Sequence, residues 1–299
     1  MKQARKYLII AACMLMGVGL VLMAAGMTAL NWNFLNLDLG GAYTERTYTA
    51  QAEDVTEIRV ELHNMKVEVI PTDADRVVLH YIDNEEEQVV LSEENGVLTL
   101  RDSSGGWDSV WRQMTSGMFH GLRKGSFTTV VEIPRGLIPS LTLNTSNAWV
   151  DVKDASFLEL SVTSSNGKLT LSDIRCKSLS ADTSNAAIVL NETTVEGAAS
   201  IVTSNGTIDL QRLTATAFDA ATSNAAIHVQ NLKAQHIALA TSNGKISGTV
   251  LGDSAQYSVT SGTSNGNSNI AHLKEDPSLS GSLSAFTSNA DIELVFEKK

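Results

Sequence analysis

The most regular feature of the sequence is a block of alternating apolar and polar positions that recurs from residue 141 to residue 299. Each block contains the tripeptide Thr-Ser-Asn, or once Ser-Ser-Asn, and Gly or Ala always follows the Asn. The marker residues are Asn147, Asn166, Asn185, Asn205, Asn224, Asn243, Asn265 and Asn289. Their spacings are 19, 19, 20, 19, 19, 22 and 24 residues. A unit this short cannot bury its apolar side alone, so the blocks are predicted to stack as a solenoid.

Alignment of the blocks on the Asn predicts two short strands in each. The third residue after the Asn is apolar in all blocks but one, and the fourth is mostly polar. The residues at the third position are Val150, Leu169, Ile188, Ile208, Ile227, Ile246, Ser268 and Ile292. A second apolar series stands six places before the Asn: Leu141, Leu160, Leu179, Ala199, Phe218, Ile237, Val259 and Leu283. Alternation with a period of two is typical of strands with one buried face. We therefore predict an all-β fold, a single-stack parallel β-solenoid (β-helix) with 19-residue coils.

The Thr-Ser-Asn row is interpreted as a structural turn ladder. Asn tolerates the left-handed backbone region, and Asn side chains stacked on neighbouring coils can hydrogen-bond to one another. The alternative is that the row is a repetitive ligand-binding surface. Gly and Ala nearly alternate after the Asn, and the sequence by itself offers no physical reason for this.

Residues 55–140 have a looser β pattern and are predicted to form an N-terminal cap, continuous with the regular solenoid of residues 141–299. Asn64 and the pair Asn95-Gly96 are interpreted as degenerate versions of the repeated corner. The cap contains an insertion, residues 105–125, that breaks the β pattern.

The insertion carries large apolar residues at helical spacing, of which we single out Trp107, Trp111, Met114 and Met118 as candidate interaction residues. Such a stripe suits contact with a membrane surface or a partner protein. The alternative is a loop that folds back over the end of the solenoid and buries both Trp side chains.

Residues 7–30 contain no charged side chain and are predicted to form a transmembrane anchor. A helix of this length spans ~36 Å, which is enough to cross a bilayer. Lys2, Arg5 and Lys6 precede the apolar run, so residues 1–6 are predicted to be a cytoplasmic stub. Residues 31–54 are interpreted as a linker, and the rest of the chain as extracytoplasmic. The alternative is a cleaved signal peptide, for which small residues such as Ala24 and Ala29 leave room.

The composition and the motifs of the chain limit the kinds of partner and of catalytic site that it can have. The formal net charge is −11, and no Lys/Arg-rich run follows the first residues, which argues against a nucleic-acid partner. Of the two cysteines, Cys13 lies in the apolar run and Cys176 is interpreted as a packed side chain. The sequence contains no His-Glu-x-x-His, no Gly-x-Ser-x-Gly and no phosphate-binding loop. We assign no catalytic residue, no metal ligand and no cofactor.

An enzyme that acts on polysaccharides is the less favoured reading. Such enzymes need a pair of carboxyl groups ~5–9 Å apart. Asp151 and Asp209 occupy the same outward position but lie three coils apart, which corresponds to ~14 Å at the usual strand separation.

The chain resembles a bacterial domain family of unknown function whose members are called putative adhesins and include the LiaG-type envelope-stress proteins. The resemblance covers roughly residues 45–299 and is carried by the strands Ile58–Leu62 and Val97–Leu100, the step Val131-Glu132-Ile133-Pro134 and the coils that follow. It implies an envelope-located β-solenoid, often tethered by a membrane segment. Family members commonly carry Ser-Gly at the corner, where this chain has Ser-Asn-Gly or Ser-Asn-Ala.

These observations favour a membrane-anchored extracytoplasmic solenoid that acts as a non-catalytic adhesin-like or scaffold module, with wall polymer or a membrane protein as partner. The alternative function is an accessory protein in envelope-stress signalling that contacts a membrane partner.

Overall fold

The computed structural model describes residues 44–83, 89–103, 128–273 and 275–298. The predicted anchor (residues 7–30) and the insertion with Trp107, Trp111, Met114 and Met118 lie outside these ranges. Within them, none of the helices has the length and apolar character needed to cross a membrane.

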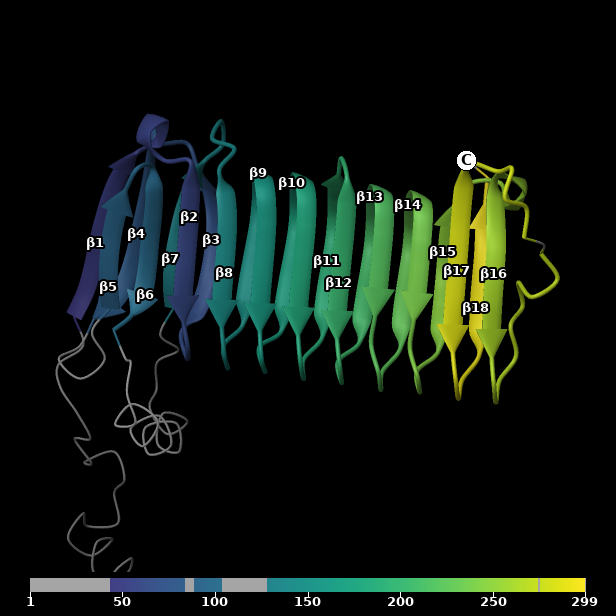
Figure 1. Cartoon of the computed structure of the whole chain (residues 1–299). Helices are drawn as coiled ribbons and strands as arrows, with labels where there is room; N and C mark the ends of the chain where they lie inside the picture. Colours follow the sequence, from purple (N-terminus) through teal and green to yellow (C-terminus); the bar gives the residue numbers. More distant parts are fainter. Residues whose placement is uncertain (1–43, 84–88, 104–127, 274, 299) are drawn as a thin grey trace, which may run out of the picture. The chain divides into compact units, whose positions relative to one another are not determined.

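The regular repeats form parallel coils, as predicted. Equivalent strands of neighbouring coils pair in register, so that Leu169 lies opposite Val150 on one side and Ile188 on the other. Figure 1 shows these strands side by side in chain order. They are β8 (Ser140–Thr145), β9 (Val150–Ser164), β10 (Leu169–Thr183), β11 (Ile188–Val195), β12 (Ala198–Thr203), β13 (Ile208–Ala221) and β14 (Ile227–Ala240). The all-β, parallel character of the repeats is therefore confirmed.

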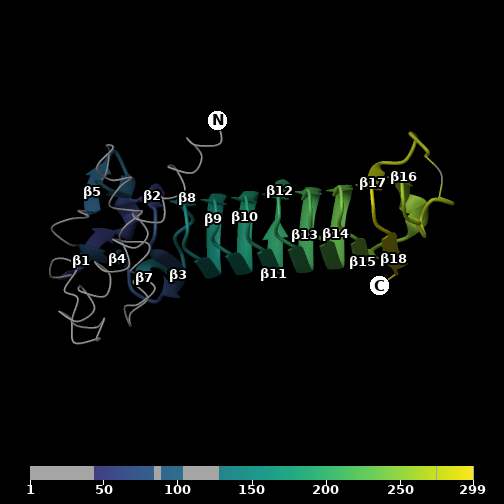
Figure 2. The same cartoon turned by 90° about the horizontal axis from the view of Figure 1, so that it is seen from below.

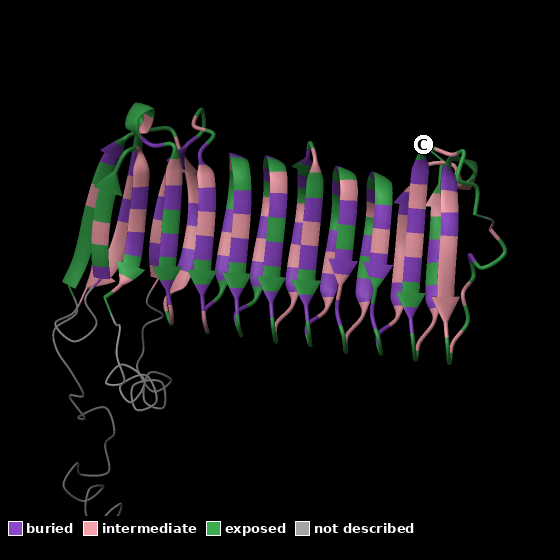
Figure 3. Ribbon diagram, in the orientation of Figure 1, coloured by how far each residue is buried: buried purple, intermediate pink, exposed green. Residues whose placement is uncertain are grey.

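The core lies between the two sides of each coil, because the predicted apolar positions point inward. Both aligned apolar series are almost fully buried, with Ser268 as the exception. Buried and exposed residues alternate along the strands in Figure 3. Phe157 and Phe218 are the largest of the fully buried side chains. Burial of each Leu, Ile or Phe stabilises the fold by about 1.5–3 kcal/mol, so the stacked core holds the coils together.

The left-handed corner lies elsewhere than predicted. The Asn residues of the tripeptide do not have positive φ; instead the seventh residue after the Asn does, in five successive coils. These residues are Asp154, Asp173, Glu192, Arg212 and Asn231, with φ between 47° and 58°. The bend sits within a continuous strand of 14 or 15 residues in most of these coils, where the pattern predicts two short strands. It sends the chain from one side of the coil to the other.

The one 20-residue spacing has a local cause. Between β11 and β12, the amide groups of Glu196 and Gly197 both donate to carbonyls of the preceding coil, at Cys176 and Lys177. On the next coil, the amides of Thr216 and Ala217 donate to the same carbonyl, that of Gly197. The extra residue is thus accommodated as an irregularity on one side of the coil, and the register of the core is unchanged.

The N-terminal strands extend the stack and then end it. Strand β2 pairs in parallel with β8, and β3 pairs in parallel with β9. Antiparallel pairs then appear between β1 and β4, β4 and β7, and β5 and β6. The strands are β1 (Thr44–Gln51), β2 (Glu57–Leu62), β3 (Lys66–Thr72), β4 (Arg76–Asp83), β5 (Val89–Glu94), β6 (Val97–Asp102) and β7 (Thr128–Pro134).

Two sequence interpretations are wrong in this region. Asn95 and Gly96 are not a repeat corner; both have positive φ (51° and 80°) and form the two-residue turn of the β5–β6 hairpin. Residues 44–54 are not a linker, because they form β1 and the 3-10 turn Ala52–Asp54. Antiparallel pairing covers the open edge that a parallel stack would otherwise leave.

The C-terminal coils do not stack in chain order. The last strands are β15 (Ile246–Leu251), β16 (Tyr257–Thr263), β17 (Gly281–Thr287) and β18 (Ile292–Glu297). Strand β17 lies between β14 and β16, and β18 pairs with β15. The coil of Asn289 is thus inserted before the coil of Asn265. Figure 2 shows the two sides of the coils at this end, with β17 on one and β15 and β18 on the other.

Ser268 explains why the coil of Asn265, and not that of Asn289, lies at the end of the stack. It stands where other blocks carry a buried apolar residue, and it forms only an isolated bridge to Ile292. The block of Asn265 therefore cannot supply a full second strand to the core. An incomplete coil is tolerated at the end of a stack, where only one side needs a neighbour.

Candidate functional site

The Asn side chains form one continuous hydrogen-bonded ladder. From the second Asn of the stack onward, each Nδ2 donates to Oδ1 of the preceding Asn, over 2.7–2.8 Å in all eight bonds. In spatial order the ladder runs through Asn64, Asn147, Asn166, Asn185, Asn205, Asn224, Asn243, Asn289 and Asn265. Asn64, interpreted from the sequence as a degenerate corner, is its first member. Because each amide is partnered by its neighbours, the ladder mainly stabilises the stack.

The Thr of the tripeptide is turned inward and tied to the neighbouring coil. Thr183 Oγ1 donates to the carbonyl of Gly167 (3.3 Å), and Thr222 Oγ1 donates to that of Gly206 (3.1 Å). Thr287 does the same to Gly244 (3.0 Å). These hydroxyls are buried and would be costly without a partner. In all coils except that of Asn265, where Thr263 is half-buried, the marker Asn and the Ser next to it are the parts of the tripeptide that reach the surface.

The alternation of Gly and Ala after the Asn has a steric cause. A Cβ on Gly167 would lie 1.7 Å from the carbonyl oxygen of Ala148, and one on Gly206 would lie 1.6 Å from that of Ala186. The spatial order is Ala148, Gly167, Ala186, Gly206, Ala225, Gly244, Ala290 and Gly266. Alternation is broken in the sequence at the last three blocks but is strict in space. Insertion of the Asn289 coil restores it.

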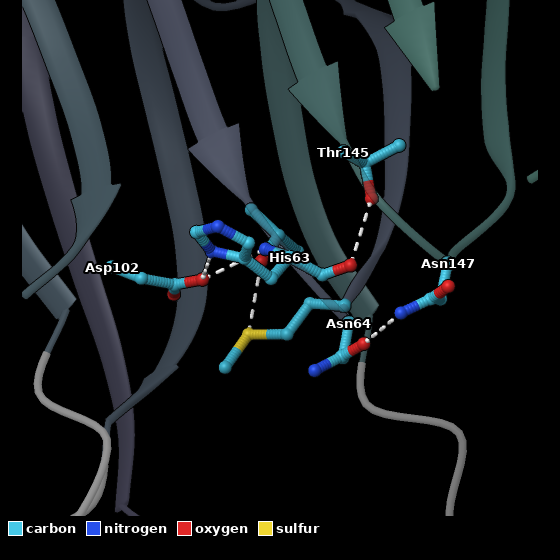
Figure 4. Close-up of polar contacts among 7 residues, drawn as sticks. His63, Asn64, Asp102, Thr145 and Asn147 are labelled. Atoms are coloured by element: carbon cyan, nitrogen blue, oxygen red, sulfur yellow. Dashed lines mark hydrogen bonds and ion pairs between the residues drawn. The ribbon is translucent and has the colours of Figure 1, made fainter. Parts of the chain in front are cut away.

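A side chain at the end of β6, Asp102, is hydrogen-bonded to the residue next to the first Asn of the ladder. Asp102 Oδ2 accepts hydrogen bonds from the backbone amide of His63 (2.7 Å) and lies 2.9 Å from its Nδ1. On the other side, Thr145 Oγ1 donates to the carbonyl of His63 (3.3 Å), beside the bond between Asn147 and Asn64 (Figure 4). Asp102 therefore joins the end of β6 to the beginning of the ladder.

A second exposed feature lies on the outward face next to the ladder. Trp149, two places after its Asn, is 63% exposed, the highest value among the large apolar residues that the structure describes. The corresponding residues on the flanking coils are Lys66 and Lys168. Backbone bonds fix this arrangement: the amide of Val67 donates to the carbonyl of Trp149, and that of Val150 donates to the carbonyl of Lys168, both over 3.0 Å. Sequence analysis missed this Trp because it lies within a regular coil.

Asp151 lies beside Trp149 on the same face. Its Oδ2 accepts a hydrogen bond from Lys153 Nζ over 2.6 Å, which raises the pKa of Lys153. Its Oδ1 is enclosed and is the one buried side-chain oxygen or nitrogen without a hydrogen-bond partner in the described ranges. An unpartnered buried oxygen costs about 1–3 kcal/mol. Polar groups in native proteins are rarely left in this state, which makes the position a candidate for ligand contact.

Glu68 is the register partner of Asp151 on the adjacent strand β3. The sequence comparison of Asp151 with Asp209 overlooked this neighbour, although Val67-Glu68-Val69 repeats the pattern of Val150-Asp151-Val152. Each carboxylate has its own ammonium partner on the same strand, Lys66 for Glu68 and Lys153 for Asp151. Across the described residues, no group of three or more His, Cys, Asp or Glu is arranged to hold a metal ion.

Cys176 is buried in the core, as the sequence indicates. Burial, together with the nearby charge of Glu196, raises the pKa of its thiol to about 12. A thiol in this state is a packing group rather than a nucleophile.

Comparison with solved structures finds similar chains of low sequence identity. One is a putative adhesin from Parabacteroides distasonis, with 13% identity, a TM-score of 0.42 and coverage of 85% of this chain and 98% of that chain. Another is a putative adhesin from Bacteroides fragilis, with 10% identity, a TM-score of 0.43 and coverage of 84% and 97%. A third is described as a putative lipid binding protein from Parabacteroides distasonis, with 15% identity, a TM-score of 0.40 and coverage of 85% and 98%.

A search of the curated proteins found no match. The profile of one family, described as Toastrack DUF4097, matches residues 55–295. This range contains the strands that carried the resemblance to bacterial adhesin domains, and the resemblance is thereby confirmed. The chain belongs to the Toastrack DUF4097 family.

Proposed function

We propose that this chain is a membrane-anchored, extracytoplasmic and non-catalytic adhesin-like module that binds a polymer of the cell envelope. The membrane part of the proposal rests on the sequence: the uncharged run of residues 7–30 follows Lys2, Arg5 and Lys6. The acidic net charge of −11 disfavours direct electrostatic binding to anionic lipid.

The observation that carries the binding role is the fixed spacing of the exposed rows. Neighbouring coils are bonded to one another through the backbone and the Asn ladder, and most of them also through a Thr hydroxyl, so outward side chains repeat at the strand separation of ~4.8 Å. A rigid surface with a repeating pattern suits a ligand that is itself a repeating polymer. It binds such a ligand with little loss of conformational entropy in the protein.

Co-sedimentation of the full chain in mild detergent with insoluble cell-wall material tests this proposal. We expect saturable binding that soluble wall fragments compete away. Binding that rises linearly with protein and resists competition would contradict it.

Residue-specific labelling tests the orientation. In a Cys13→Ala background, Ser165→Cys places a thiol on the exposed ladder edge, and Gln3→Cys places one in the stub. We expect an impermeant maleimide added to intact cells to label the first variant only. Labelling of the second alone would reverse the orientation.

The accessory-signalling function is the alternative. Its candidate contact residues, Trp107 and Trp111, lie outside the described residues. Two results together would favour the signalling function over the proposed one. The parent chain would not bind wall material, and replacement of both Trp residues would abolish binding to a membrane-protein partner.

A further inference from the structure

The outward face beside the ladder combines four different chemical groups on two adjacent coils. Trp149 directly precedes β9, and Lys168 holds the same position before β10. Asp151 and Thr170 are register partners two residues further along. We call this group the Trp149 subsite; its members are Trp149, Asp151, Lys168 and Thr170.

The spacing within the Trp149 subsite follows from strand geometry. Neighbouring coils are ~4.8 Å apart, and residues two apart on a strand are ~6.7 Å apart on the same face. The subsite therefore presents an aromatic ring, a carboxylate, an ammonium and a hydroxyl over an area comparable to one pyranose ring. The backbone bonds of Val67 and Val150 hold both coils in place.

We propose that the Trp149 subsite binds one saccharide ring of a glycan, an inference that rests on the proposed envelope-binding function and names its ligand class. A pyranose has an apolar face of C–H groups and a rim of hydroxyls. The exposed indole of Trp149 provides a flat apolar surface for that face, with 63% of the residue accessible. The hydroxyl rim then lies over the polar members of the subsite.

The polar members supply both acceptors and donors. Oδ1 of Asp151 is enclosed and has no hydrogen-bond partner; on binding, the carboxylate would turn so that a sugar hydroxyl donates to this oxygen. Lys168 is exposed and has no ion-pair partner within the part of the chain that the structure describes, so its ammonium is free to donate. Thr170 contributes a hydroxyl that serves in either role.

The charge of the surroundings selects the kind of ligand. Lys66 and Lys153 are already paired with Glu68 and Asp151. Of these three lysines, Lys168 is the one whose ammonium is not paired with a carboxylate among the residues that the structure describes, so this face is less basic than its number of lysines suggests. A single uncompensated ammonium favours a neutral or weakly acidic saccharide over a polyanion.

The test follows the indole N–H signals of the full chain in detergent by two-dimensional NMR. The chain has four Trp residues, and the signal of Trp149 is the one missing from a Trp149→Phe variant. The probes are chitotetraose, cellotetraose and, as a separate arm, phosphatidylglycerol vesicles. We expect a saturable shift of the Trp149 signal with at least one saccharide and none with the vesicles.

Variants separate the subsite from the rest of the surface. Trp149→Ala is expected to weaken saccharide binding about tenfold or more, because exposed aromatic anchors carry much of the energy at such sites. Asp151→Asn and Lys168→Met are expected to weaken it by about threefold each. The matched control is Phe286→Ala, which removes another exposed aromatic, 44% accessible and located on β17. It is expected to leave the dissociation constant unchanged.

Three results would overturn the inference: no shift with either saccharide, a shift with vesicles alone, or equal saccharide affinity in Trp149→Ala and the parent. Wall sedimentation distinguishes this failure from failure of the proposed function. If Trp149→Ala still sediments with wall material, the binding role stands and the subsite is wrong. If the parent chain does not sediment, the envelope-binding function fails as well.

Discussion

Asn289 donates a hydrogen bond from Nδ2 to Oδ1 of Asn243 over 2.7 Å, although Asn265 lies between them in the sequence. Asn265 in turn donates to Asn289, so the last two blocks are exchanged in the ladder. The chain passes to the end of the stack, forms β16, and then returns to insert β17 and β18. The C-terminal coil is therefore held on both sides.

The exchanged order predicts a specific cross-linking pattern. In a Cys13→Ala background, Asn243→Cys with Asn289→Cys places two thiols on adjacent coils, ~4.8 Å apart, which suits a disulfide. Asn243→Cys with Asn265→Cys places them two coils apart, ~9.6 Å, which does not. We expect oxidation to join only the first pair, as seen by gel mobility after proteolysis. Efficient joining of the second pair would instead indicate stacking in chain order.

The steric origin of the Gly/Ala alternation predicts an unequal response to added methyl groups. Gly206→Ala forces a Cβ against the backbone carbonyl of Ala186 and is expected to destabilise the fold by about 1–3 kcal/mol, seen as a lower urea midpoint. Gly136→Ala is the control, because nothing lies within 4 Å of its added Cβ. It is expected to change stability by less than about 0.5 kcal/mol. Equal midpoints for the two variants would disprove the steric explanation.

The ladder predicts that an interior Asn matters more than a terminal one. Asn185→Ala removes a ladder bond on each side, to Asn166 and from Asn205, whereas Asn265→Ala removes only the bond to Asn289. At about 0.5–1.5 kcal/mol for each bond, the interior variant is expected to lose roughly twice as much stability. Thermal unfolding followed by circular dichroism measures the difference. A larger loss at the terminal position would refute this prediction.

Burial of Cys176 predicts slow thiol chemistry in the folded state. Its raised pKa, about 12, leaves almost no thiolate at pH 8, so a disulfide reagent is expected to react only after denaturant is added. An exposed thiol introduced by Ser165→Cys, in a Cys13→Ala background, should react at once under native conditions. Prompt native labelling of Cys176 would show that this part of the core opens readily.

The raised pKa of Cys176 makes the stability of the fold depend on pH. The thiol ionises in the unfolded chain near its ordinary pKa of 9.0 but in the folded chain only near 12. Its contribution to stability is therefore fully present below pH 9 and is lost as pH rises from there toward 12. Comparison of urea midpoints between pH 8 and pH 10.5 for the parent and Cys176→Ala isolates this effect. The fall should be smaller in the variant, and an equal fall would remove Cys176 as its cause.

The sequence by itself determined the strands, the coil length and the buried face. Alternation such as Val150-Asp151-Val152 is a local property, since successive side chains of a strand must point to opposite faces. The spacing of the Asn residues likewise fixed the period of the stack. The ladder residues could be named in advance because each coil repeats the same local chemistry.

What only the tertiary structure decided are relationships between coils. The order of Asn243, Asn289 and Asn265 depends on which block completes a second strand and on where a Gly must meet an Ala carbonyl. The place of the left-handed corner depends on closing each coil over the core rather than on the preference of Asn for that backbone. The neighbourhood of Trp149 depends on β3 pairing with β9, which brings together residues more than 80 positions apart, Glu68 and Asp151. Such contacts are set by long-range pairing, which no local pattern encodes.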